Sequence, residues 1–287
     1  MFERSRSICF SWYLAIAFTE VLLMFTLSSD FAVSYPMLVL VSFLVGLGSF
    51  VDASAGGGGL ITVPAYLLTG MPAHFAYGTN KVSAACGTFL AAVKFWRSGA
   101  MNIFAAFWAM LGSLTGSYIL ARAALMLSDM TLRTLQLVVI PFVAVVILAR
   151  KNFSDEDRSG IFSGRKLGLM SFVIGFCIGG YDAIIGPGTG TFAIIAFALV
   201  TKFDLKTAAG NAKVLNCASG AASLAAFAMA GTVYWKLAVP TTICSLLGNQ
   251  LGARLALKNG AKYIRPMLIC VLSLLLIKLA CDVIGRI

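Results

Sequence analysis

The two halves of this chain share one pattern: an acidic residue, a glycine-rich stretch and a lysine, set in segments apolar enough for a lipid bilayer. The three features recur in the same order: Asp52, Gly56–Gly59 and Lys81, then Asp182, Gly186–Gly190 and Lys213. The two aspartates are 130 positions apart and the two lysines 132. A near-constant offset over so long a stretch indicates a duplicated unit. Broken apolar helices at matching places in two halves point to the binding site of a transporter.

The composition places the chain in a membrane. It is 60% hydrophobic and 11% charged, and its mean hydropathy is +0.92, which is typical of α-helical proteins that cross the bilayer several times. The net charge of +11 is scattered over helix ends, whereas nucleic-acid binding needs clustered Lys and Arg. The seven cysteines form no CxxC pair, so we expect free thiols.

The first apolar stretch, residues 8–27, could be a signal peptide or a retained helix. It is longer than a typical signal-peptide core, contains Glu20 and lacks a clear cleavage site before Asp30. We therefore predict an N-terminal transmembrane helix within residues 1–35.

Further apolar segments follow along the chain. They cover residues 36–55, 60–70, 72–96, 102–122, 131–149, 167–185, 189–201, 205–230, 233–257 and 265–284. Pro72 suits a first helical position and Asp204 an N-cap. Lys81 and Lys213 each lie nine residues beyond those starts, about 13 Å deep by helix rise and near the bilayer midplane.

Two of these segments, 60–70 and 189–201, are too short to span the bilayer comfortably and each follows a glycine-rich break. They predict re-entrant or discontinuous helices, which survive at that depth only if protein or water surrounds them. The alternative is that the glycines simply allow close helix packing.

The basic residues set the topology through the positive-inside rule. With a cytoplasmic N-terminus and hairpins that return to one side, most basic residues fall inside: Arg97, Arg150, Lys151, Arg158, Arg165, Lys166, Lys202, Lys206, Lys258, Lys262 and Arg265. Those left outside are Arg122, Arg133, Lys236 and Arg286. The prediction is an all-α polytopic membrane protein of about eight crossings and two hairpins, built as an inverted repeat. Its parts are the N-terminal helix 1–35, a first repeat 36–149, a cytoplasmic linker 150–166 and a second repeat 167–287.

The two mid-bilayer lysines are the first candidates for chemistry. Burying a lysine there costs about 2.5–3.5 kcal/mol, so each must face a partner or a wet cavity. Two at matching places suggest a site for an anion. The alternative is a permanent ion pair within each half, Lys81 with Asp52 and Lys213 with Asp182.

Neutral donors near the lysines extend the candidate site. The restarting helices offer backbone N–H groups that attract anions, and the predicted substrate-binding groups are Gly57, Gly58, Gly59, Gly188, Thr189, Thr79, Asn80, Asn211 and Asn216. The amides could instead hydrogen-bond helix to helix. Asp52 and Asp182 would bind a coupling proton or gate the lysines.

Other patterns exclude several functions. Gly112 with Gly116, and Gly248 with Gly252, have the small-xxx-small spacing of close helix packing. His74 is the only histidine, so we expect neither a metal nor a cofactor. The glycine run lacks the Gly-Lys-Ser/Thr ending of a P-loop, which leaves gradient-driven or passive transport.

These motifs resemble the TauE/SafE family of sulfite-exporter-like transporters, and its YfcA-like branch above all. The resemblance covers about residues 36–284 and rests on the segments Gly48–Pro64, Gly78–Lys81, Tyr181–Gly190, Ala212–Asn216, Gly252–Arg254 and Ile264–Pro266. It implies a multi-pass transporter of the cytoplasmic membrane for small sulfur-containing or organic anions. Asn211-Ala212 replaces Thr79-Asn80 in the second half, so the half-sites should differ.

We therefore predict secondary transport of a small anion, such as sulfite or a sulfonate, with the lipid bilayer and the anion as partners and no nucleic acid. A passive anion channel is the first alternative. An intramembrane enzyme is the second, but the chain shows no cluster of acid, base and nucleophile.

Overall fold

The computed structural model describes residues 33–124, 157–184, 186 and 188–284. All secondary structure in this part is helical: α2 (Tyr35–Ala55), α3 (Gly59–Leu67), α4 (Ala73–Arg97), α5 (Ile103–Ala124), the 3-10 turn η1 (Ser159–Ile161), α7 (Gly164–Ile184), α8 (Thr189–Ala196), the π-helical turn η2 (Phe197–Thr201), α9 (Leu205–Met229), α10 (Trp235–Asn259) and α11 (Ala261–Ile284). The predicted segments 8–27 and 131–149 lie outside the described residues. The all-α prediction is confirmed for the described part.

Local sequence explains where several helices begin. The Asp204 side chain accepts hydrogen bonds from the backbone N–H groups of Lys206 and Thr207, as an N-cap should, so that prediction is confirmed. Pro72 lies one position earlier than predicted, as the N-cap residue of α4. Helix α7 begins at Gly164, inside the predicted linker 150–166.

The outer surface is apolar and the interior carries hydroxyls and amides. On α10, Val239, Ile243, Leu247 and Leu251 form an exposed stripe at four-residue spacing, which is one helix face. By length and hydropathy, three of the described helices could cross a membrane: Tyr35–Ala55, Ile103–Leu120 and Leu205–Met229. An apolar face this long on a folded chain fits lipid and not water.

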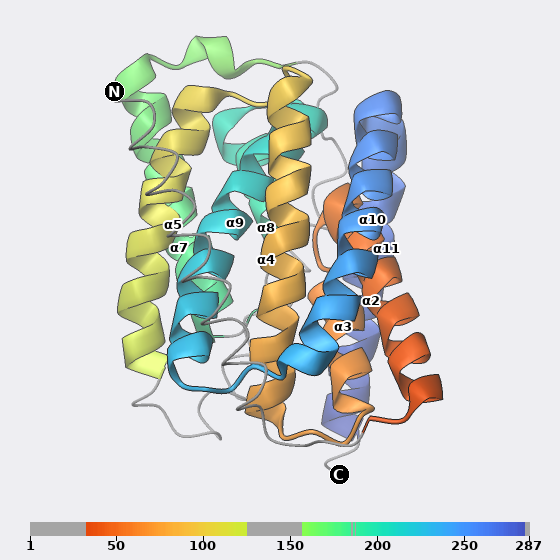
Figure 1. Ribbon diagram of the computed structural model, residues 1–287. Helices are drawn as coiled ribbons and strands as arrows, with labels where there is room; N and C mark the ends of the chain where they lie inside the picture. The colour runs from red at the N-terminus through yellow and green to blue at the C-terminus, as the bar shows by residue number, and fades with distance from the viewer. Residues whose placement is uncertain (1–32, 125–156, 185, 187, 285–287) are drawn as a thin grey trace, which may run out of the picture.

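The two short helices, α3 and α8, follow the glycine-rich breaks at matching places in the two halves. Helix α2 ends at Ala55 and α3 begins at Gly59, while α7 ends at Ile184 and α8 begins at Thr189. Each short helix packs against the long helix before it and turns back along it (Figure 1). The two breaks meet near the middle of the molecule, since a Cβ added to Gly56 would lie 2.1 Å from the backbone nitrogen of Thr191.

The helices of the two halves interlock reciprocally. Helix α5 packs on α7 and α10 on α2, while α4 and α9 contact each other and lie centrally in the bundle (Figure 1). The predicted small-residue packing is confirmed. A Cβ added to Gly116 would lie 2.1 Å from the Phe176 carbonyl oxygen, and a Cβ added to Gly248 would lie 2.1 Å from the Gly46 carbonyl oxygen. Gly116 and Gly248 are 132 positions apart, so they are the matched pair and Gly112 lies one turn earlier.

Hydrogen bonds repeat with the same offset. The Ser113 hydroxyl donates to the Leu215 carbonyl at 2.9 Å, and the Ser245 hydroxyl donates to the Ser83 carbonyl at 2.7 Å. Both serines come from the fourth helix of one half and bond the lysine-bearing helix of the other. Such bonds replace water for groups buried away from it, and they hold α4 and α9 in a defined register.

Candidate functional site

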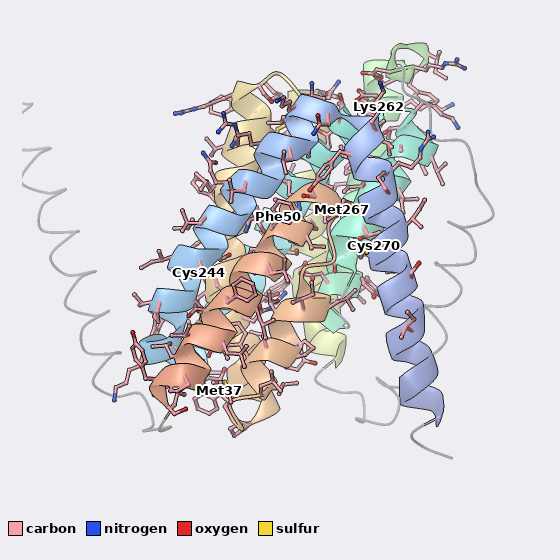
Figure 2. All side chains as sticks on the ribbon, turned by 90° about the vertical axis from the view of Figure 1, so that its right-hand side faces the viewer. Met37, Phe50, Cys244, Lys262, Met267 and Cys270 are labelled. Atoms are coloured by element: carbon pink, nitrogen blue, oxygen red, sulfur yellow. The ribbon has the colours of Figure 1, made fainter. Side chains whose placement is uncertain are left out.

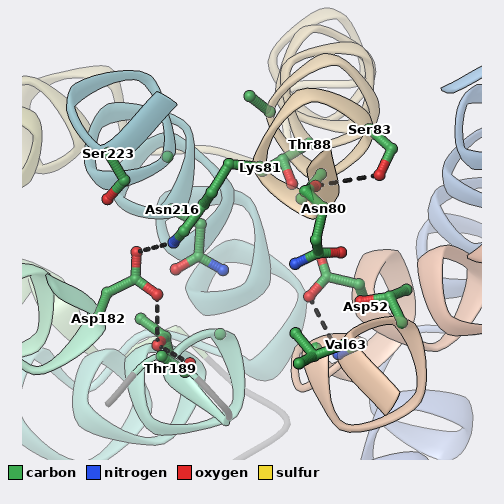
Figure 3. A pocket seen from close by; sticks show the side chains of 18 of the residues that line it. Asp52, Val63, Asn80, Lys81, Ser83, Thr88, Asp182, Thr189, Asn216 and Ser223 are labelled. Carbon is green, nitrogen blue, oxygen red and sulfur yellow. Dashed lines mark hydrogen bonds and ion pairs between the residues drawn. The ribbon is translucent and has the colours of Figure 1, made fainter. Parts of the chain in front are cut away.

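The two lysines predicted to lie near the bilayer midplane form ion pairs that cross between the halves. Lys81 Nζ lies 3.1 Å from Asp182 Oδ2, and Lys213 Nζ lies 3.1 Å from Asp52 Oδ2. Figure 3 shows the Lys81–Asp182 contact at one side of the cavity. The alternative of pairs within each half was therefore wrong. Each lysine helix packs against the opposite half, which brings the distant aspartate closer.

A cavity of about 470 Å³ lies beside these pairs. Ten of the predicted site residues line it: Asp52, Gly57, Gly58, Gly59, Asn80, Lys81, Asp182, Gly188, Thr189 and Asn216. Three others, Thr79, Asn211 and Lys213, do not. Among the described residues, no group of three or more His, Cys, Asp or Glu side chains is placed to hold a metal ion.

Thr79 and Asn211 support the neighbouring half of the bundle. The backbone N–H of Tyr234 donates to the Thr79 hydroxyl at 3.0 Å, and the backbone N–H of Asn102 donates to the Asn211 side-chain oxygen at 3.2 Å. Asn102 directly precedes α5 and Tyr234 directly precedes α10. Each hydrogen bond therefore gives a partner to a backbone N–H at the start of a helix, where the helix itself supplies none. Both side chains are fully buried.

The first break is held by several contacts around Asp52. Its carbonyl oxygen accepts from the Gly56 N–H at 2.8 Å and also from the Lys213 ammonium. Its carboxylate accepts from Lys213 and, at 3.3 Å, from the Gly58 N–H. One lysine therefore binds both the end of α2 and the carboxylate that spans the break.

The second break is held differently around Asp182. Its carboxylate accepts from Lys81 through Oδ2 and from the Thr189 hydroxyl through Oδ1 at 2.9 Å. The Gly186 N–H donates to the Tyr181 carbonyl, one residue earlier than the matched bond in the first half. No backbone bond from Lys81 to the end of α7 accompanies the ion pair among the contacts of the described residues.

The two lysines differ in access to the cavity. The Lys213 side chain has no exposed surface, whereas that of Lys81 is 16% exposed. Lys81 lines the cavity and Lys213 lies behind Asp52. A charge that is to meet a solute must be reachable, so the two lysines cannot act alike.

Two amides reach the cavity from non-equivalent positions. Asn80 comes just before Lys81, and Asn216 three residues after Lys213. Figure 3 shows the two side chains on different helices, with Asn216 beside the Lys81–Asp182 pair and Asn80 across the cavity beside Asp52. The amide oxygens of both are buried without a hydrogen-bond partner, and unsatisfied groups of this kind are rare in folded proteins.

Several hydroxyls of the cavity were missed from the sequence. It is lined by Ser49, Tyr77, Ser83, Thr88 and Ser223 together with the predicted residues. Thr88 lies seven residues after Lys81, and Ser223 seven after Asn216, so helical spacing would have placed both on the faces already chosen.

Comparison with known proteins identifies the family. Residues 38–279 match the family model described as sulfite exporter TauE/SafE, close to the span of the sequence resemblance. The chain belongs to the TauE/SafE family. No solved structure matches it.

Relatives at full length carry transporter names. A probable membrane transporter protein of Haemophilus influenzae is 37% identical over 251 residues, covering 85% of this chain and 95% of the relative. The probable membrane transporter protein YfcA of Escherichia coli is 33% identical over 268 residues, covering 91% and 96%. A third, ORF9 of a Sinorhizobium species, is 31% identical over 240 residues, covering 82% and 89%. This chain is thus a member of a membrane transporter family.

Proposed function

We propose that this protein is a secondary transporter that carries a small anion through the cavity between its halves. The observation that carries the proposal is the Lys81–Asp182 pair, which lies in the wall of a 470 Å³ cavity in a membrane protein. A charged residue inside a bilayer normally faces a partner or a pathway for solutes. Here it has both.

The proposed substrate class is sulfite, a sulfonate or another small organic anion. The matching family model is described as a sulfite exporter, which supports sulfur-containing anions. The cavity offers the Lys81 ammonium and the hydroxyls of Thr62 and Thr88. Ammonium, hydroxyl and backbone N–H groups are the donors that bind anions in proteins.

We also propose that the two halves form an inverted repeat with re-entrant breaks. The support is reciprocal: Lys81–Asp182 mirrors Lys213–Asp52, and the Ser113 bond mirrors the Ser245 bond. Matched helices also run in opposite directions: α4 rises in Figure 1 where α9 descends. Alternating access in such folds moves one part against another around a fixed site.

The charge distribution supports one orientation in the cytoplasmic membrane. The ends of α4 and α10 and the starts of α7, α9 and α11 share the upper end in Figure 1. That end carries Lys94, Arg97, Arg165, Lys166, Lys206, Lys258 and Lys262, and Figure 2 shows nitrogen-tipped side chains gathered around Lys262. By the positive-inside rule this end, and the predicted N-terminus, face the cytoplasm.

Cysteine labelling tests the orientation. Ser159 is buried, so the neighbouring Gly160, with open space around its Cα, is the better site in a cysteine-free background. Gly160→Cys should resist a membrane-impermeant maleimide in intact cells, while Ala230→Cys at the end of α9 should react. Labelling of Gly160→Cys alone would reverse the orientation.

Reconstitution tests the transport itself. Purified protein in liposomes should move radiolabelled sulfite with a saturable rate, and an imposed proton gradient should raise uptake if Asp52 or Asp182 carries a coupling proton. A rate that rises linearly with concentration and ignores the gradient would instead support the passive channel. Lys81→Met should abolish the saturable component.

A further inference from the structure

The two crossed ion pairs are equivalent by sequence and different in their surroundings. We propose that an incoming anion replaces the Asp182 carboxylate on Lys81, while the Lys213–Asp52 pair stays closed and positions the first break. This inference rests on the proposed anion transport and assigns its one exchangeable contact.

Access to the cavity selects Lys81. The Lys81 side chain keeps 16% of its surface exposed and that of Asp182 keeps 11%, and both residues line the cavity. The Lys213 side chain has no exposed surface and does not reach it. An anion in the cavity therefore approaches the Lys81–Asp182 pair directly, whereas Lys213 is shielded by Asp52.

The number of contacts selects the same pair. Lys213 bonds both the carboxylate and the carbonyl oxygen of Asp52, so losing it would expose the end of α2 as well as a charge. Lys81 bonds only the carboxylate of Asp182 among the hydrogen bonds of the described residues. A single charge-assisted bond is the easier one to exchange.

The displaced carboxylate keeps a partner. The Thr189 hydroxyl lies within hydrogen-bond distance of both Asp182 Oδ1 and the Gly186 carbonyl oxygen, so its one proton is available to the carboxylate, while Lys81 binds Oδ2. When Lys81 turns to an anion, Asp182 therefore retains one hydrogen bond. Two negative groups on one ammonium repel each other strongly where the dielectric constant is low, so anion and carboxylate compete for Lys81.

The unpartnered amides lie where the exchange takes place. Asn80 and Asn216 line the cavity, each with a buried amide oxygen that has no hydrogen-bond partner. An amide oxygen accepts hydrogen bonds, so these oxygens suit an O–H donor, and an anion would be bound by the N–H groups of the same amides. In Figure 3, Asn216 lies beside the Lys81–Asp182 pair and Asn80 lies across the cavity beside Asp52, so one neutral amide is next to the exchanged charge.

Neutralising each pair as a whole tests the proposal, with the other pair as the matched control. The variants are Lys81→Met/Asp182→Asn and Lys213→Met/Asp52→Asn, because removing both charges avoids leaving one buried and unpaired. The probes are sodium sulfite and sodium methanesulfonate, and the measurement is the concentration that gives half of the maximal thermal stabilisation of the full-length protein in detergent.

The first double variant should lose stabilisation by either probe. The second should keep the wild-type half-saturating concentration within about threefold, and its maximal transport rate in liposomes should fall, since Lys213 and Asp52 position the break without binding the anion. Loss of binding in both double variants, or only in the second, would overturn the assignment.

The single variant Asp182→Asn gives a sharper test, because the proposal predicts a gain in affinity for the probe. Without its competitor, Lys81 should bind the probe about tenfold more tightly than in the wild type, whereas Asp52→Asn should bring no gain. Equal or weaker binding by Asp182→Asn, with normal binding by the wild type, would overturn the exchange alone. No stabilisation of the wild type or of Asp182→Asn by either probe would overturn the proposed anion site as well.

Discussion

The two glycine breaks carry the same kind of ion pair but hold its carboxylate with different groups. Around the first break, Asp52 accepts bonds from Lys213 and from the Gly58 backbone. Around the second, Asp182 accepts from Lys81 and from the Thr189 side chain. The lysine–carboxylate distance is 3.1 Å in both. The charge pair is thus retained, and the groups that fix the carboxylate decide whether it can move.

The matched glycines Gly56 and Gly186 should give the largest difference between the breaks. Both have positive φ, 75° and 80°. A Cβ on Gly56 would lie 2.1 Å from the Thr191 nitrogen, whereas one on Gly186 meets nothing closer than 3.6 Å. Gly56→Val should therefore lose at least ~3 kcal/mol of stability and yield little folded protein.

Gly186→Asn is the control for that substitution, because asparagine tolerates positive φ. It should cost about 1 kcal/mol and leave a normal yield by fluorescence-detected size exclusion. A similar loss of folded protein in both variants would mean that backbone conformation, and not the contact between the breaks, sets the cost.

Substitutions of the two lysines should have the next largest effects on the free energy of unfolding. Lys213→Met removes two bonds and leaves Asp52 without its charge partner, at about 3–5 kcal/mol. Lys81→Met leaves Asp182 with the Thr189 hydroxyl and partial exposure, so about 1–2 kcal/mol is expected. Thermal unfolding in detergent without added anion should show the larger fall for Lys213→Met; an equal fall would make the two pairs equivalent supports.

Much of the fold could be predicted from the sequence because its causes are local. The glycine runs ended α2 and α7 where predicted, and Asp204 caps α9 because an N-cap depends on residues two and three positions away. The small-residue spacing near Gly116 and Gly248 also gave close packing, since a missing side chain acts at its own position.

The site could be predicted only in part, because it depends on how the halves interlock. The pairing of Lys81 with Asp182 follows from packing between elements about a hundred residues apart. The spacing of residues within one half therefore does not predict this pair. Thr79 and Asn211 sit beside the lysines in sequence, yet they accept backbone bonds from the neighbouring half. Which helix face meets which neighbour decides between ligand and support.

The matched serines offer a finer comparison. Ser113→Ala removes one buried bond to Leu215 and should cost about 1 kcal/mol. Ser245→Ala removes the bond to Ser83 and also strands the Ser49 hydroxyl, which donates to Ser245 at 2.7 Å. It should cost about 2 kcal/mol, and unfolding temperatures of the two variants check the ratio. Ser49→Ala/Ser245→Ala should recover part of the loss, because no donor is then stranded.

The amides should give the smallest change in stability and the clearest separation of stability from binding. The Asn80 and Asn216 oxygens have no partner, so Asn80→Ala and Asn216→Ala break no hydrogen bond of these oxygens, and the free energy of unfolding should stay within ~0.5 kcal/mol of the wild-type value or rise slightly. Asn249 lines the same cavity and its oxygen also has no partner, but its amide nitrogen donates to the Ser245 carbonyl at 3.1 Å, so it is the control whose loss should destabilise. If the N–H groups of the Asn80 and Asn216 amides donate to the anion, sulfite binding should weaken by about threefold to tenfold in both variants with folding intact. Binding at wild-type strength would instead mean that the Asn80 and Asn216 amides contact water and not the anion. The anion would then contact only Lys81 and the hydroxyls.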